Sequence, residues 1–277
     1  MKSSIRRNLR KNMRHLMLEA MSALEFFIPV STKPKVHFIL LHHIRSDEVK
    51  AFGMLLDWLK EHYELVSYSD AVQGLNNPSS GKCLAAISFD DGLKNNLNAA
   101  REMKVRDISG CFFISPGIIG ESNQKVVADY CRDRMLFKHQ DSFMDWNDLD
   151  SLKADGHELG NHSMSHYYMA DLSDSQFHEE VESAKILLEK KYGQIKHFAW
   201  PYGQFCRFSK ERVGKVLDMG HESCASGERG SHQPDGGAES MCLRRENIDV
   251  SWPLRHAKTL IKRGGRSPIA SIDTWPA

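Results

Sequence analysis

Residues 88–92 read Ser-Phe-Asp-Asp-Gly, and this stretch decides the fold of the 277-residue chain. It follows residues 84–87, an apolar run of strand length, and it precedes residues 93–103, whose pattern predicts a helix. Two adjacent carboxylates therefore stand where a strand ends and a helix begins, the place where α/β folds collect catalytic groups. Because neighbouring side chains at a strand end point in different directions, one carboxylate can bind a metal while the other acts as a base.

A simpler interpretation of this Asp pair is helix capping, because Asp is a favoured N-cap residue and Gly eases the turn. A second stretch, His-Ser-Met-Ser-His at residues 162–166, favours catalysis, since it also follows a short predicted strand, residues 156–161. Two histidines at this spacing can face one ion from a single helical turn, although isolated pairs are mostly solvated or core groups. One Asp with two His leaves a divalent cation open positions for water and substrate, as in a hydrolytic site.

With both stretches in view, the chain resembles the polysaccharide deacetylase family, also called carbohydrate esterase family 4 or the NodB-homology domain. The first motif of that family, T/S-F-D-D-G, matches residues 88–92, and its second, H-S/T-x-x-H, matches residues 162–166. Its third motif, R-x-P-Y, is matched only in part by residues 199–202, Ala-Trp-Pro-Tyr. The resemblance covers roughly residues 36–250.

Strand and helix patterns alternate along the chain, which indicates a parallel sheet with helices outside, either open or closed into a barrel. The resemblance implies the closed form, a distorted (β/α) barrel with about seven parallel strands. We expect residues 36–262 to form this catalytic domain and residues 263–277 to form a loose tail. Residues 116–145 are loop-rich, and a segment of this length is usually a substrate-shaping insertion or a mobile flap. The formal net charge of +1 gives no bulk attraction to nucleic acid.

The segment of residues 1–30 has six Lys and Arg residues between positions 2 and 14, and its apolar residues recur at three- and four-residue steps. This pattern predicts a basic amphipathic helix. This helix either packs on the domain or lies on a membrane surface as a peripheral contact, and packing is slightly favoured. Glu19 and Glu25 interrupt the apolar run, so it does not form the hydrophobic core of a secretory signal. We therefore expect a cytoplasmic protein, in which the six dispersed cysteines are free thiols.

The resemblance also implies the roles of individual residues. Asp91, His162 and His166 would hold a divalent metal, for which zinc is the expected ion, and Asp90 would be the general base. The backbone N–H of Tyr202 would bind the oxyanion. The implied activity is removal of an N-acetyl group from an amino sugar of a polysaccharide or glycan precursor. The alternatives are deformylation, hydrolysis of a sugar O-acetyl ester, or sugar binding by a catalytically degenerate site.

Two positions depart from the family pattern. The Arg that opens the third motif and steadies the base is Ala199 here, and Arg244 or Arg245 on a predicted late strand could replace it. The family's L-x-H motif, which supplies the general acid, matches both His256 near the C-terminus and His42 at the end of the first predicted strand. We favour His42, since some relatives carry this motif permuted to the front of the domain.

Other side chains near the motifs have more than one interpretation. Trp200, next to Pro201, and Trp146 could stack on sugar faces, although core packing is the commoner role of Trp. Ser163 or Asn161 could orient a metal ligand. We expect His43 to be structural, because it points away from His42 on a strand, and His157 to be a packing group.

Overall fold

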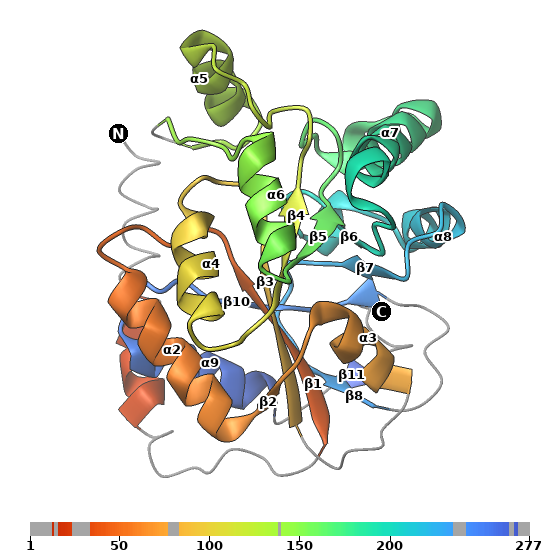
Figure 1. Ribbon diagram of the computed structural model, residues 1–277. Helices are drawn as coiled ribbons and strands as arrows, with labels where there is room; N and C mark the ends of the chain where they lie inside the picture. Colours follow the sequence, from red (N-terminus) through yellow and green to blue (C-terminus); the bar gives the residue numbers. More distant parts are fainter. Residues whose placement is uncertain are drawn as a thin grey trace.

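The computed structural model describes residues 13, 16–23, 34–76, 83–137, 140–234, 242–265 and 269–270. Strands and helices alternate along this part of the chain, and the helices lie outside a central sheet (Figure 1). The strands are β1 (Lys35–Leu41), β2 (Glu64–Leu65), β3 (Cys83–Phe89), β4 (Gly110–Ile114), β5 (Glu158–Asn161), β6 (His197–Ala199), β7 (Ser223–Ala225), β8 (His232–Gln233), β9 (Cys242–Leu243), β10 (Glu246–Asn247) and β11 (Ile269–Ala270). The helices are α2 (Val49–His62), α3 (Tyr68–Asn76), α4 (Asn96–Lys104), α5 (Gln124–Asp133), α6 (Trp146–Ala154), α7 (Asp174–Tyr192), α8 (Lys210–Asp218) and α9 (Leu254–Gly264), with 3-10 turns η1 (Met169–Asp171) and η2 (Phe205–Arg207).

The sheet forms a nearly closed barrel of mostly parallel strands. β1, β3, β4, β5, β6 and β7 are neighbours in that order, and each pairs with the next in parallel. The last position is shared by two short strands, because β9 pairs with β7 and β10 pairs with β1. The chain between β9 and β10 therefore returns from the far edge to the first strand, which confirms the predicted barrel of about seven strands.

The register of the sheet places the carboxyl ends of the strands at one rim. Leu41 lies opposite Phe89, and Phe89 lies opposite Phe112. Ile114 lies opposite Asn161, which in turn lies opposite Phe198. The residues that directly follow these strand ends are those of the sequence motifs, so strands far apart in the sequence deliver them to one place.

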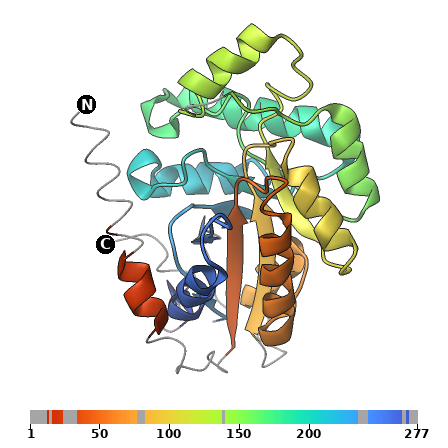
Figure 2. The same ribbon diagram turned by 90° about the vertical axis from the view of Figure 1, so that its left-hand side faces the viewer.

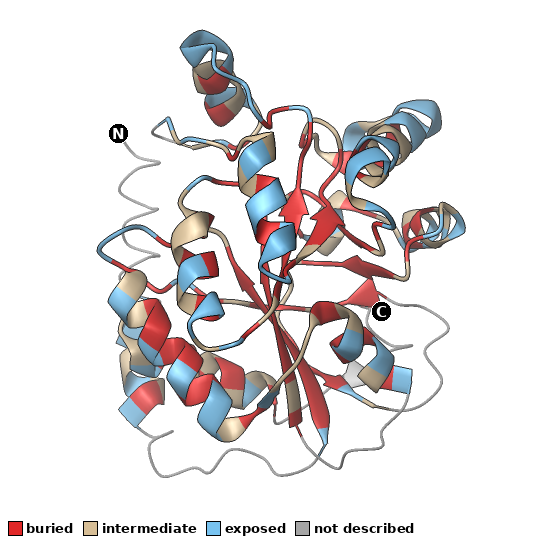
Figure 3. Ribbon diagram, viewed as in Figure 1, coloured by how far each residue is buried: buried red, intermediate tan, exposed pale blue. Residues whose placement is uncertain are grey.

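Burial explains why these segments became strands and helices. Every residue of β1 is buried, as expected of a strand with barrel interior on one face and helices on the other (Figure 3). Helix α2 buries Phe52, Leu55, Leu56 and Leu59, which recur at three- and four-residue steps and therefore share one face. No disulfide joins the cysteines of the described residues, and Cys206 is exposed while the other five are buried.

Two sequence-based expectations about local structure were wrong, and the loop-rich segment contains a helix that the sequence did not predict. Within residues 116–145, α5 begins after Asn123, whose side chain accepts hydrogen bonds from two backbone amides. The predicted late strand that carries Arg244 and Arg245 is not one strand, because β9 ends at Leu243 and β10 begins at Glu246. The tail is not wholly loose, because β11 pairs with β8.

The described part of the N-terminal segment packs on the domain. Residues 16–23 are helical and lie beside α9, as Figure 2 shows. The hydroxyl of Thr259 donates to that of Ser22 at 3.0 Å, and Glu19 forms an ion pair with Arg255. The inner face of this helix therefore packs on the domain. Every helix in the described ranges is too short or too polar to cross a bilayer.

Candidate active site

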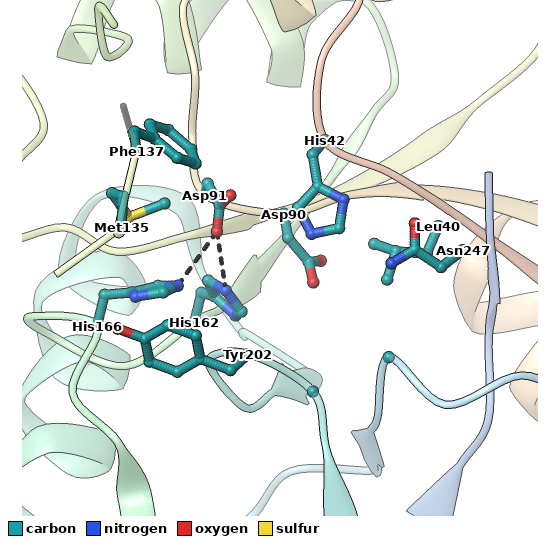
Figure 4. A pocket seen from close by; sticks show the side chains of 12 residues that line it. Leu40, His42, Asp90, Asp91, Met135, Phe137, His162, His166, Tyr202 and Asn247 are labelled. Carbon is teal, nitrogen blue, oxygen red and sulfur yellow. Dashed lines mark ion pairs between the residues drawn. The ribbon is translucent and has the colours of Figure 1, made fainter. Parts of the chain in front are cut away.

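A cavity of about 140 Å³ lies at the carboxyl rim of the barrel and gathers most of the residues singled out from the sequence (Figure 4). Its wall combines titratable groups from strand ends with apolar groups from the long connection after β4. The lining residues are Leu40, His42, Asp90, Asp91, Met135, Phe137, His162, His166, Tyr202, Gly203, Gly227 and Asn247.

Asp91, His162 and His166 converge at one point of this cavity. One carboxylate oxygen of Asp91 lies 3.3 Å from Nε2 of His162 and 3.3 Å from Nε2 of His166. All three side chains are buried, and their ligand atoms lie within 4.8 Å of one another. This separation suits three ligands of one ion, because metal–nitrogen and metal–oxygen bonds of about 2 Å span such a triangle.

The hydrogen bonds behind the two histidines fix which nitrogen faces Asp91. Nδ1 of His162 donates to the carbonyl of Ala199 at 2.7 Å, and Nδ1 of His166 donates to the carbonyl of Arg134 at 3.1 Å. A neutral imidazole with its proton on Nδ1 presents a lone pair at Nε2. Two lone pairs and a carboxylate oxygen therefore meet in a buried site, and such a group of acceptors fits a cation.

The electrostatics of the cavity also favour positive charge at this point. Burial alone would lower the pKa of His162, but Asp90 and Asp91 reverse this and raise the pKa. Burial likewise opposes ionisation of Asp91, yet the two histidines hold the pKa of that carboxyl well below its usual range. The site is thus built around an ionised carboxylate that attracts a cation.

The loop that carries the two histidines is not helical, so the expectation of a single helical turn was wrong. Ser163 and His166 both have left-handed backbones, with φ of 63° and 55°. The side chain of Asn161 accepts from the Ser163 amide at 2.9 Å, and the Ser163 hydroxyl accepts from the His166 amide at 3.2 Å. These bonds hold a strained turn that a helix would not need, and they agree with the predicted supporting role of Asn161 and Ser163.

Asp90 forms a buried ion pair with Arg245. Two guanidinium nitrogens of Arg245 donate to the two oxygens of Asp90, each at 2.7 Å, and Arg245 is fully buried. Burial raises the pKa of Asp90, but Arg245 and His162 outweigh it and lower the pKa below the ordinary value. Of the two arginines considered as replacements for the motif arginine, Arg245 is therefore the one that contacts Asp90. Arg244 points elsewhere, with its guanidinium 4.7 Å from the ring centroid of Phe205.

Of the two histidines considered for the acid, His42 and His256, only His42 lines the cavity. Its ring points into the space beside Asp90 (Figure 4). His256 is fully buried in α9 and lies 3.1 Å from Glu19, so its candidacy is contradicted by its place in the fold. His43 contacts the amide of Asn95 at 3.2 Å outside the cavity, in agreement with the structural role expected for it.

Two residues of the third motif have different positions: Trp200 packs in the core below the rim, and Tyr202 lines the cavity. Trp200 is fully buried and stacks on Phe208 at 4.5 Å, so of its two interpretations core packing is confirmed and sugar stacking is wrong. Pro201 is also buried and does not line the cavity. Tyr202 lines it with a left-handed backbone (φ 63°). The next residue, Gly203, lies so close to the backbone of Gly227 that a side chain would collide with it.

The connection after β4 contributes residues that the sequence did not identify. The carbonyl of Arg134 accepts from His166 and also from the hydroxyl of Tyr202, so one backbone oxygen joins a metal-ligand candidate to the third motif. Met135 and Phe137 form an apolar wall above the histidines (Figure 4). A backbone carbonyl carries no sequence signal, but the apolar residues after α5 could have indicated a wall. Trp146 lies on α6 outside the cavity, and His157 accepts from the Gly110 amide at 3.2 Å, as a packing group does.

The barrel and its rim of two carboxylates, two histidines and a third-motif tyrosine define the class of carbohydrate deacetylases built on the NodB fold. The chain belongs to the polysaccharide deacetylase family, whose sequence model matches residues 77–222. Membership of this family supports a hydrolase that deacetylates a sugar. No curated protein matches the chain.

Solved structures share the fold over most of the chain. The deacetylase PplD of Streptococcus pyogenes, solved with acetate, is 15% identical with a TM-score of 0.64, covering 82% of this chain and 97% of that one. IcaB from Ammonifex degensii is 19% identical with a TM-score of 0.64, covering 81% and 99%. The BpsB deacetylase domain from Bordetella bronchiseptica is 13% identical with a TM-score of 0.58, covering 80% and 98%. At these identities the likeness establishes the fold alone.

Proposed function

We propose that this protein is a metal-dependent N-deacetylase acting on an acetylated amino sugar. The observation that carries the proposal is the convergence of Asp91, His162 and His166, with both Nδ1 protons held by carbonyls, beside the ion-paired Asp90. These three residues would hold the divalent ion, with zinc as the expected metal because two imidazoles and one carboxylate are ligands that it favours. When bound, the ion would supply a Lewis acid for the acyl carbonyl and acidify a water.

The residues of the chain would then carry the proton transfers. Arg245 keeps Asp90 ionised at neutral pH, so this carboxylate can accept the proton of the attacking water. His42, beside Asp90 in the same cavity, would protonate the nitrogen as its bond to the acyl carbon breaks. The backbone N–H of Tyr202 is our candidate for the oxyanion donor, because Tyr202 lines the cavity. Leu40, Met135 and Phe137 provide apolar surface from which water is displaced.

The proposal is tested by following acetate release from a panel of acetylated amino sugars, before and after chelation and after addition of zinc. Activity that disappears on chelation and returns with the metal supports the proposal. The double variant His162→Ala with His166→Ala should bind no metal by elemental analysis, whereas His157→Ala should keep it, since His157 lies outside the cavity. Activity that survives full removal of metal would overturn metal dependence. Release of formate, or of acetate only from O-acetyl esters, would identify a different acyl substrate.

A further inference from the structure

Helix α5 stands at the edge of the molecule (Figure 1), yet its C-terminal end reaches a candidate metal ligand. The amides of Arg134 and Met135 both donate to the carbonyl of Tyr130, and the helix ends there. Arg134 is the C-cap residue, so its carbonyl lies beyond the last amide that the helix itself could offer. The partial negative charge at this end of a helix favours hydrogen-bond donors from other parts of the chain.

Two donors of the catalytic rim bind this carbonyl. Nδ1 of His166 donates to it at 3.1 Å, and the hydroxyl of Tyr202 donates to it as well. The rings of His166 and Tyr202 meet edge to face with their centroids 4.8 Å apart, so one oxygen fixes two neighbouring side chains (Figure 4). Because the hydrogen bond at Nδ1 orients the imidazole, the position of this carbonyl determines where Nε2 of His166 points.

The side chain of Arg134 ties the same carbonyl to the residue that follows His166. Its guanidinium carbon lies 3.6 Å from the ring centroid of Tyr167, and one of its nitrogens donates to the Tyr167 hydroxyl at 2.5 Å. Both side chains are half-buried, and a cation over an aromatic face is stabilising where water is partly excluded. The loop needs such support, since the backbone of His166 is left-handed, with φ of 55°.

We infer that Arg134 and Tyr167 are positioning residues for the candidate metal ligand His166. Their contact fixes the carbonyl of Arg134 and the loop of His166 relative to each other, so that Nε2 of His166 faces Asp91. Neither residue is among those that line the cavity, so both act through His166 and not by touching a substrate. The inference rests on the proposed function, because it takes Asp91, His162 and His166 as ligands of a metal.

The test measures zinc affinity by competition between the zinc-loaded full chain and a chromogenic chelator. Arg134→Ala and Tyr167→Ala both keep the backbone carbonyl, so a loss of affinity reports the contact between the side chains. We expect each variant to bind zinc about tenfold more weakly, the lower end of the usual effect for groups that orient a metal ligand. The double variant should be no weaker than either single variant, because each substitution already removes the contact.

Tyr167→Phe keeps the ring under the guanidinium and loses only the hydroxyl group. Its zinc affinity should lie between those of the wild type and Tyr167→Ala. Because this substitution is so small, it also decides the question if an alanine variant does not fold. A second readout separates positioning from general destabilisation. The visible absorption bands of the cobalt-substituted protein depend on ligand geometry, so they should shift in Arg134→Ala and Tyr167→Ala.

Arg132→Ala is the matched control, because Arg132 is an exposed arginine of the same helix that pairs with Asp129 and Asp133. It should leave both zinc affinity and the cobalt spectrum unchanged. If Arg134→Ala and Tyr167→Ala also leave them unchanged, or if their losses add in the double variant, the inference is overturned while the proposed function stands. A wild-type protein that binds no divalent ion would overturn the metal dependence of the proposed function and the inference with it.

Discussion

Arg245 and Asp90 are 155 residues apart in the sequence, yet they form a two-fold hydrogen-bonded ion pair at the centre of the rim. Each of the two bonds is 2.7 Å long, and both side chains are buried. The planar guanidinium matches the two oxygens of the carboxylate, which a lysine in the same place could not do. The pair therefore fixes the orientation of Asp90 while keeping it ionised.

Removing the guanidinium should cost both stability and turnover. Arg245→Met would leave Asp90 as a buried charge without its partner, and we expect the free energy of unfolding to fall by about 3–5 kcal/mol. Adding Asp90→Asn removes that charge, so the double variant should lose less stability than the sum of the single variants. Urea unfolding of the four proteins measures this coupling. Arg244→Met is the control and should show no coupling to Asp90→Asn, because Arg244 contacts Phe205 instead.

This ion pair illustrates what the sequence could and could not predict. The motif spacing predicted the convergence of Asp91, His162 and His166, because parallel strands deliver their ends to one rim. The motif spacing could not distinguish Arg244 from Arg245 as the partner of Asp90. The two arginines are adjacent, and the choice depends on which of them faces the barrel interior. The pairing of the short strands β9 and β10 determines that Arg245 contacts Asp90. The apolar pattern of the sequence does not encode this pairing.

Other errors had different physical causes. The spacing of His162 and His166 fits a helical turn, but the left-handed backbones of Ser163 and His166 give a loop instead. Trp200 looked available for sugar binding because it adjoins a motif, and only the position of Phe208 shows that it is a core residue. The carbonyl of Arg134 could not be predicted, because a backbone group depends on tertiary placement alone.

Asparagine substitutions of the two carboxylates in the first motif should have different effects on metal content. Asp91→Asn should lose metal, since Asn carries no charge to balance the ion beside His162 and His166. Asp90→Asn should retain it and lose turnover, because Asn cannot accept the proton of water. Elemental analysis and acetate release measure the two properties side by side. Loss of metal from Asp90→Asn would show that Asp90 is itself a ligand and would reverse the assignment.

Glu246 should make the stability of the protein depend on pH. It is buried, and burial raises its pKa to about 7 although Arg229 lowers it. The folded state therefore binds a proton at Glu246 that the unfolded state has released, so the stability that Glu246 contributes is fully present below about pH 4.3 and is lost as the pH rises through about 7. The loss should be on the order of 3–4 kcal/mol, since one pKa unit corresponds to 1.36 kcal/mol.

The variant Glu246→Gln tests this dependence because glutamine does not titrate. Relative to the wild type, it should become progressively more stable between pH 5 and pH 8, as measured by urea unfolding at each pH. Glu179→Gln, an exposed substitution on α7, should keep a constant difference from the wild type over the same range. Parallel curves for Glu246→Gln and the wild type would mean that Glu246 is ionised throughout.

The N-terminal helix leaves an apolar stripe exposed, and we propose that it contacts an anionic membrane surface. Met13, Leu16 and Met17 are 64%, 76% and 63% exposed, while the opposite face of the same segment packs on α9. The double variant Leu16→Glu with Met17→Glu should lower flotation with anionic vesicles and leave stability unchanged, because both residues are already in water. Leu187→Glu, an exposed position on α7, is the control. Equal flotation of all three proteins would exclude the stripe as a membrane contact.

His42 is our candidate for the general acid, and it lines the same cavity as Asp90. An amide nitrogen is a poor leaving group unless it is protonated as its bond breaks, so the acid must lie in the same cavity as the base. His42→Ala should reduce turnover by a factor of ~10²–10⁴, the usual contribution of a positioned proton donor, and should keep the metal. It should also abolish the fall in rate at high pH, since that limb reports loss of the proton from the acid. His43→Ala and His256→Ala should do neither, because both lie outside the cavity. An active His42→Ala variant with an unchanged pH profile would assign the proton transfer to another group of the rim.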